Sequence, residues 1–162
     1  MTQQTETHAK LVVDDEFKVG PVHDRVFGSF VEHLGRCVYT GIYELMEAVN
    51  LGTRGLAEAL DLLEYANVPN GTARSKERIR NGAKDPFNIR MWCLGNEMDG
   101  PWQTGHKSAE DYGKLAASAA AGMRMIDPDL ELVVCGSSSH TMDTFGAWEE
   151  TVLEQTFDKV DF

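Results

Sequence analysis

The chain has 162 residues, of which 42% are hydrophobic and 25% charged, and this is enough for one globular domain with a core. A closed (β/α)8 barrel typically takes about 250 residues and rarely fewer than about 200, so the chain is too short for a complete one. The formal net charge of −11 disfavours a nucleic acid or an anionic membrane surface as partner.

The first part of the chain predicts strands joined by a turn. Two short runs rich in Val and Phe, at 10–13 and 26–31, are separated by Gly20, Pro21 and Asp24. The first ten residues are polar and lack the basic stretch and apolar run of a secretory signal. We therefore expect a cytoplasmic protein.

The middle of the chain predicts a helix followed by a long loop. Residues 55–66 place Leu56, Leu60 and Leu63 at helical spacing, with acidic residues between them. Residues 67–88 contain Pro, Gly and Asn together with five basic residues, which we interpret as a solvated loop and not a binding patch.

From residue 89 onward, strand and helix signals alternate. Strands are predicted over 89–94, over 130–135 and from Lys159. The first helix starts after the N-cap Ser108 and ends before Pro128, and its buried stripe is Tyr112, Leu115, Ala116, Ala119 and Met123. The second helix is marked by Phe145, Trp148, Val152 and Phe157. This alternation predicts βα repeats and a parallel sheet in one α/β domain. Loops at the carboxyl ends of such strands usually carry the active site.

The strand over 89–94 is followed at once by polar residues. Glu97 is the leading catalytic candidate, because its apolar neighbours Leu94 and Met98 predict desolvation and a raised pKa. Asn96 is suited to hydrogen bond a substrate hydroxyl, and Trp102 lies where it could stack on a sugar. A bare Asn-Glu pair is common, so an exposed loop carboxylate without a catalytic role is the alternative.

A second acid, Glu32, follows the strand over 26–31. Two carboxylates at neighbouring strand ends are what glycosidic-bond cleavage needs, and a separation of about 5 to 5.5 Å implies retention. Glu32 and Glu97 fit that pattern, although Glu32 also fits a ligand-orienting or structural role. The five histidines and three cysteines show no HExxH or CxxC spacing, so we expect no metal site and no cofactor.

Several long segments together resemble family 51 glycoside hydrolases, the intracellular α-L-arabinofuranosidases. They are residues 27–36 (FGSFVEHLGR), 38–44 (VYTGIYE), 48–55 (AVNLGTRG), 92–102 (WCLGNEMDGPW) and 105–107 (GHK). The resemblance implies a (β/α)8 barrel and a retaining enzyme that releases terminal L-arabinofuranose from arabinan, arabinoxylan and related oligosaccharides. It implies that Glu97 is the general acid/base, that Asn96 is the neighbouring hydrogen-bond partner of the sugar, and that Glu32 binds sugar hydroxyls.

This resemblance replaces the pairing of Glu32 with Glu97 as two catalytic acids. In the family the nucleophile is another glutamate, from a strand near the barrel's carboxyl end, and the resemblance places that position beyond Phe162. A long stretch of the family, including the second barrel strand, also separates the two segments that meet here at residues 44–48. We therefore expect an incomplete barrel in a single partial catalytic domain, with an N-terminal β segment over 1–24, a barrel portion over 25–162 and a deletion junction near 44–48.

With these parts missing, we expect the isolated chain to hydrolyse little or nothing. The alternative is a non-catalytic module that binds arabinose-containing saccharides or serves in assembly, and a third reading is another barrel glycosidase such as a xylanase. The exposed strand edges of an incomplete barrel favour self-association, so a homo-oligomer is a further hypothesis.

Overall fold

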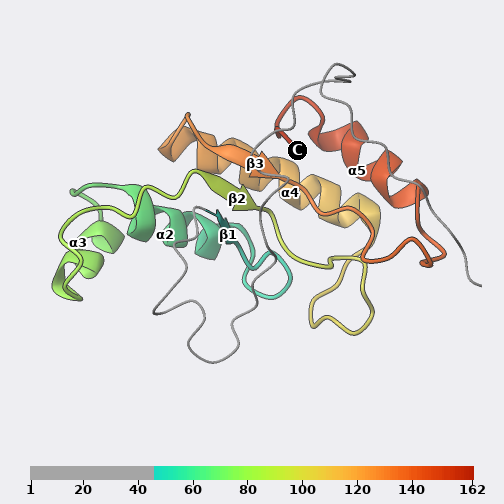
Figure 1. The fold of residues 1–162 in the computed structure, drawn as a ribbon, viewed down its shortest axis with the longest axis horizontal. Helices are drawn as coiled ribbons and strands as arrows, with labels where there is room; N and C mark the ends of the chain where they lie inside the picture. The colour runs from blue at the N-terminus through green and yellow to red at the C-terminus, as the bar shows by residue number, and fades with distance from the viewer. Residues whose placement is uncertain (1–45) are drawn as a thin grey trace, which may run out of the picture. The chain divides into compact units, whose positions relative to one another are not determined.

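A computed structural model of the chain describes residues 46–162 (Figure 1). Glu32, the strands expected at 10–13 and 26–31, and the β segment expected over 1–24 lie outside the described residues. These residues belong to one compact unit.

Three short parallel strands form the sheet, as the alternating pattern predicts. They are β1 (Met46–Ala48), β2 (Met91–Cys93) and β3 (Glu131–Val133), side by side in that order. β2 pairs in parallel with each neighbour, and Met46, Met91 and Glu131 stand at one level of the register. β1 was not predicted as a strand, and it lies within residues 44–48, where a deletion junction is expected from the resemblance.

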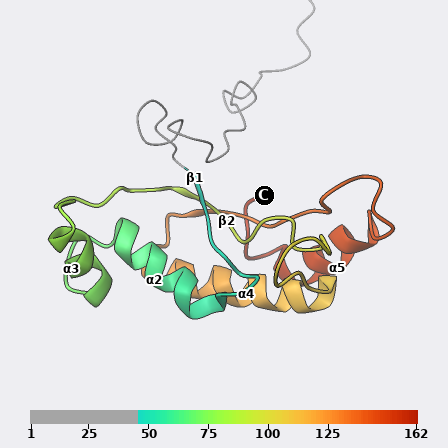
Figure 2. The same cartoon turned by 90° about the horizontal axis from the view of Figure 1, so that it is seen from below.

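The helices are α2 (Gly55–Asn67), α3 (Ala73–Arg80), α4 (Ala109–Ile126) and α5 (Ala147–Thr156). Figure 2 shows α2, α4 and α5 together on one side of the strands. α4 connects β2 to β3, and α2 and α3 connect β1 to β2, so the described residues form successive βα units. The α/β class and the partial-barrel architecture are thereby confirmed.

The core lies between the sheet and this helix layer. Trp92 and Leu132 point toward the helices and are fully buried. Ala116, Ala119 and Ala120 of α4 are also fully buried, and α4 packs against α2 and α5.

α4 begins and ends close to the predicted positions. The Ser108 Oγ atom accepts the Asp111 N–H at 3.1 Å, which is the expected N-cap. In the predicted stripe, Leu115 is only half-buried. In α5, Trp148 is buried as predicted, but Phe145 is 57% and Phe157 79% exposed, so the predicted apolar face of that helix is wrong at both ends.

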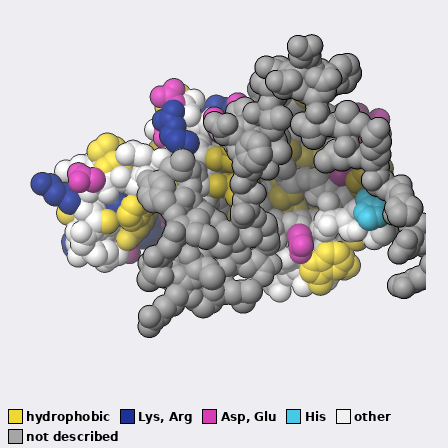
Figure 3. Space-filling view, viewed as in Figure 1, with side chains coloured by type: hydrophobic (Ala, Val, Ile, Leu, Met, Phe, Trp, Pro, Cys, Tyr) yellow, Lys and Arg dark blue, Asp and Glu magenta, His cyan; other side chains and the backbone are white. Residues whose placement is uncertain are grey.

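The prediction of a continuous loop over 67–88 is wrong, because α3 lies inside it. Thr72 and Ser75 form a reciprocal capping box at its start, a signal that the interpretation as a loop missed. Arg74 forms ion pairs with Asp61 and Glu77, and Figure 3 shows basic and acidic side chains interspersed on the described part of that face. The basic residues there do not form a separate positive patch.

One of these basic residues, Arg78, is fully buried. Its guanidinium donates to the carbonyl oxygens of Tyr65 at 2.9 Å, Val68 at 2.7 Å and Pro69 at 2.8 Å, and its Nε to that of Ala83 at 3.2 Å. These carbonyls belong to the end of α2 and to the segments flanking α3, so one cation ties both helices together and satisfies acceptors that the end of α2 leaves open.

Residues 160–162 run along the outer edge of β3, where the sequence predicts a further strand. The Phe162 N–H donates to the Leu132 carbonyl at 3.1 Å, and the Phe162 carbonyl accepts the Val134 N–H at 2.9 Å. This alternation is the parallel ladder pattern.

No helix within residues 46–162 is both long and apolar enough to cross a membrane.

We predict that Arg78→Met lowers the free energy of unfolding by about 2–4 kcal/mol, because the carbonyl oxygens that the buried guanidinium bonds lose their donor. Chemical denaturation followed by circular dichroism measures the loss. Arg80→Met is the matched control: Arg80 is exposed on the same helix, and its replacement should change stability by no more than about 0.5 kcal/mol. Equal losses in the two variants would contradict the role assigned to Arg78.

Candidate active site

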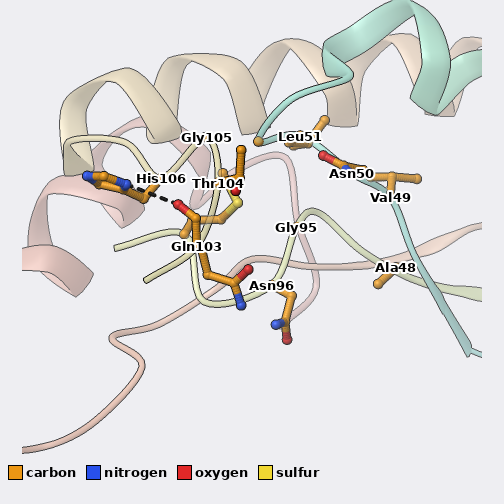
Figure 4. Close-up of a pocket in the computed structure, with 12 residues that line it drawn as sticks. Ala48, Val49, Asn50, Leu51, Gly95, Asn96, Gln103, Thr104, Gly105 and His106 are labelled. Carbon is orange, nitrogen blue, oxygen red and sulfur yellow. Dashed lines mark hydrogen bonds between the residues drawn. The ribbon is translucent and has the colours of Figure 1, made fainter. Parts of the chain in front are cut away.

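A cavity of about 200 Å³ opens at the carboxyl ends of β1 and β2. One wall is the segment Ala48–Gly52 after β1, and the other comes from the loop after β2, including Asn96, Gln103 and His106 (Figure 4). This is the edge of a parallel sheet where α/β proteins place their active sites. Both walls lie within segments that carry the family resemblance.

The two walls meet through glycine backbone. Gly105 has a φ of +87°, and a Cβ atom there would lie 2.5 Å from the carbonyl group of Gly52. The Lys107 Nζ also donates to the Gly52 carbonyl oxygen at 3.3 Å. The contact therefore requires glycine at 105 for both conformation and space, and it fixes the loop after β2 against the loop after β1.

Glu97 lies in the tight turn that follows β2. Its φ is +45° and that of Gly95 is +105°, so the chain reverses sharply at the strand end. The Glu97 Oε2 accepts hydrogen bonds from Trp102 Nε1 at 2.7 Å and from Gln103 Nε2 at 3.0 Å. Among the described residues, none donates to the Oε1 atom of Glu97.

The predicted raised pKa of Glu97 is wrong. The hydrogen bond from Trp102, and next that from Gln103, lowers the pKa of Glu97 below its ordinary value, and the small opposing effect of burial does not offset them. Leu94 and Met98 are buried in the core, and they do not enclose the carboxylate enough to reverse this shift. Glu97 is therefore ionised at neutral pH in these surroundings.

The structure brings Asn96, Glu97 and Trp102 together. Asn96 is exposed and lines the cavity, whereas Trp102 is 58% exposed and contacts Glu97 directly. Trp92 is in the core, as expected for a tryptophan in a strand. Glu32 lies outside the described residues.

Sequence reasoning missed the support behind the site. Asp99 is buried and accepts the backbone N–H of Ser138 at 3.1 Å as well as the Ser138 hydroxyl. This pair ties the loop after β2 to the loop after β3. The serines after β3 and the acid after β2 were visible in the sequence, but only the parallel register brings them together. Within residues 46–162, no group of three His, Cys, Asp or Glu side chains is placed to hold a metal ion.

The family model for the α-L-arabinofuranosidase 1 domain matches residues 29–161. An exo-α-(1→6)-L-arabinofuranosidase from Bifidobacterium longum is 52% identical, over 95% of this chain and 45% of the relative. An intracellular exo-α-(1→5)-L-arabinofuranosidase from Streptomyces lividans is 43% identical, over 94% of this chain and 36% of the relative. The chain thus spans less than half the length of these relatives.

Solved structures give the same result. A family 51 α-L-arabinofuranosidase from Bifidobacterium longum superposes with a TM-score of 0.70 and 53% identity, covering 72% of this chain and 23% of that chain. An α-L-arabinofuranosidase from Thermotoga maritima, solved as an arabinose complex, gives a TM-score of 0.64 and 35% identity over 71% of this chain and 23% of that chain.

The alignment with the first relative is longer than the chain itself. It extends over 236 positions, whereas the chain has 162 residues. The relative therefore contains residues inside the aligned range that have no counterpart here.

We predict that Trp102→Phe raises the pKa of Glu97 toward that of an ordinary glutamate, because it removes the larger of the two hydrogen bonds. Carboxyl ¹³C NMR measures the titration, and Asp61, whose pKa is lowered by its hydrogen bond to Arg74, is the internal control. Since the folded-state pKa of Glu97 is lowered, its bonds stabilise the fold at neutral pH, and this stabilisation is lost as the pH falls through that pKa. An unchanged titration of Glu97 in the variant would refute the hydrogen-bond explanation.

We also predict that Gly105→Ala destabilises the fold more than Gly71→Ala. Both glycines have positive φ, at +87° and +103°, and alanine in such a conformation costs about 1–2 kcal/mol. Only Gly105 has backbone within reach of the new Cβ, whereas Gly71 has nothing within 4 Å. Thermal unfolding compares the two variants, and equal shifts would show that the loop contact is unimportant for stability.

Proposed function

The chain belongs to the family 51 α-L-arabinofuranosidases, and from this premise we propose that the turn after β2 is the proton-transfer side of a retaining arabinofuranosidase site. In this proposal Glu97 is the general acid/base toward the glycosidic oxygen of a terminal L-arabinofuranose. Asn96 and Glu32 position the sugar hydroxyls, and Trp102 is a further contact for the sugar. The observation that carries the proposal is the placement of Asn96 in the cavity wall and of Glu97 next to it, in the turn at the carboxyl end of β2.

The two oxygens of the Glu97 carboxylate have different surroundings. Oε2 accepts both described hydrogen bonds, from Trp102 and Gln103. Oε1 is the atom that remains for a leaving-group oxygen or an attacking water. We propose that protons are exchanged at Oε1 while the bonds to Oε2 hold the carboxylate in place.

The lowered pKa keeps Glu97 ionised, and this is the form that takes a proton from water in the base half of a retaining reaction. For the acid half Glu97 must carry a proton, and a second carboxylate close by would raise its pKa for that purpose. The family resemblance places the nucleophilic glutamate outside the 162 residues. We therefore propose that these residues alone hydrolyse little or nothing.

The domain organisation that we propose is a single partial catalytic domain, with a β segment over 1–24 and a barrel portion over 25–162. The 236-position alignment supports a deletion inside the chain, and the motif spacing favours its placement near 44–48. We further propose a cytoplasmic location, which is supported by relatives named as intracellular enzymes, and a self-associating chain with no nucleic-acid or membrane partner.

A saccharide-binding role is the second candidate. Among the described residues, the cavity is lined by the amides of Asn50, Asn96 and Gln103, by Thr104 and His106, and by apolar groups and backbone, and no carboxylate lines it. Amides and hydroxyls of this kind bind sugar hydroxyls without chemistry.

Calorimetric titration of the 162-residue chain with arabino-oligosaccharides tests the site. We expect heat of binding without product, and a roughly tenfold weaker affinity in Asn96→Ala through the loss of about one hydrogen bond. Asn70→Ala removes an exposed amide from the loop before α3 and should bind as the wild type does. A wild-type chain that gives no heat would contradict the proposed function in both its forms.

Hydrolysis of an aryl arabinofuranoside tests the expected inactivity separately. We expect turnover at the level of the buffer, both in the wild type and in Glu97→Ala. Turnover that is lost in Glu97→Ala but kept in Glu77→Ala would show that the chain is an active enzyme on its own, and would contradict the proposed inactivity.

A further inference from the structure

The hydrogen-bond ladder between β2 and β3 is interrupted one residue before the site. The Leu94 N–H donates to the Val133 carbonyl at 2.8 Å, and in a parallel ladder the next bond runs from the Cys135 N–H to the Leu94 carbonyl. Here the Cys135 N–H donates instead to the Tyr112 hydroxyl at 2.8 Å, and this hydroxyl donates to the Leu94 carbonyl at 2.7 Å. The hydroxyl oxygen of Tyr112 thus replaces one backbone–backbone hydrogen bond between β2 and β3.

The Tyr112 hydroxyl is held firmly in this position. Tyr112 is fully buried on α4, and its ring stacks on that of Trp148 of α5, with centroids 5.5 Å apart and planes 14° apart. Trp148 Nε1 donates to the carbonyl of Cys135 at 2.9 Å, so the two aromatic residues bond both backbone groups of Cys135. Burial raises the pKa of Tyr112, which keeps the hydroxyl protonated and able to donate.

The inserted oxygen lengthens the path between the two strands at their carboxyl ends. Two hydrogen bonds in series span the gap that one bond spans elsewhere in the ladder. Leu94, the residue on the β2 side, is followed directly by Gly95, Asn96 and Glu97. The separation of the strand ends therefore sets the point from which the turn with the proposed acid/base begins.

We propose that the Tyr112 hydroxyl is a positioning group for the Gly95–Glu97 turn: it separates the ends of β2 and β3 and so places Asn96 at the cavity and Glu97 against Trp102. This inference rests on the proposed function for its role in saccharide binding. Tyr112 acts only through Leu94, and it touches neither Glu97 nor the cavity. Without the hydroxyl, the Cys135 N–H can bond the Leu94 carbonyl directly, which closes the strand ends and moves the turn.

Tyr112→Phe in the full chain tests the proposal, because it keeps the stacked ring and removes only the bridging oxygen. We expect the Trp102 indole N–H resonance to shift in ¹H–¹⁵N NMR spectra, the Glu97 carboxyl titration to change, and arabino-oligosaccharide affinity to fall several-fold. Tyr65→Phe is the matched control, since Tyr65 also accepts a hydrogen bond at its hydroxyl, from Asn81 Nδ2, on a helix away from the site. It should leave all three signals unchanged.

A Tyr112→Phe chain that is less stable but keeps the wild-type Trp102 resonance and Glu97 titration would overturn the proposal, since the hydroxyl would then be only structural. If the wild-type chain binds no saccharide, the proposed function fails, but the two NMR signals still decide the positioning role. Should Tyr112→Phe not fold, amide hydrogen exchange in the wild type gives the answer. We expect a protected Cys135 amide, and exchange at the rate of a free amide would overturn the bridge.

Discussion

The packing of α4 against α2 and α5 is the constraint on which the rest of the described structure depends. Ala116, Ala119 and Ala120 are fully buried on this helix, and they leave room for Trp92 and Leu132 to fill the space beneath the strands. Tyr112 lies one turn before Ala116 on the same face. The helix that carries these buried alanines therefore also places a hydroxyl at the ends of β2 and β3.

The polar and acidic side chains of the candidate site lie at the same end of the sheet. The turn after β2 holds Asn96 at the cavity and Glu97 in contact with Trp102, while Asp99 bonds to Ser138 in the loop after β3. Each of these side chains comes from a connection: Glu97 is held by bonds within its own loop, and Asp99 is bonded to the loop after β3. A site built in this way depends on strand order and register more than on any one loop.

Sequence patterns predicted the parts of this structure that local physics decides. The parallel α/β arrangement, the N-cap at Ser108 and the buried position of Trp92 follow from periodicity and capping.

The charge state of Glu97 was mispredicted, because its donors, Trp102 and Gln103, reach back across a turn whose conformation the sequence does not reveal. The apolar neighbours Leu94 and Met98 are buried in the core, and the hydrogen bonds outweigh the effect of burial on the carboxylate. α3 was missed although its capping pair was visible, because Pro, Gly and Asn dominated the interpretation of that segment. Phe157 was placed in the core on spacing alone, and the helix ends before its side chain reaches the core.

The contact between Gly52 and Gly105 has a consequence for the choice of ligand. Side-chain walls adapt to different molecules by changing rotamers, but backbone packed on backbone has no rotamer to change. The part of the cavity wall where the two loops meet therefore presents a nearly fixed contour. A ligand that enters the cavity meets at this point a surface that does not yield, so its shape there is tested before any hydrogen bond is made.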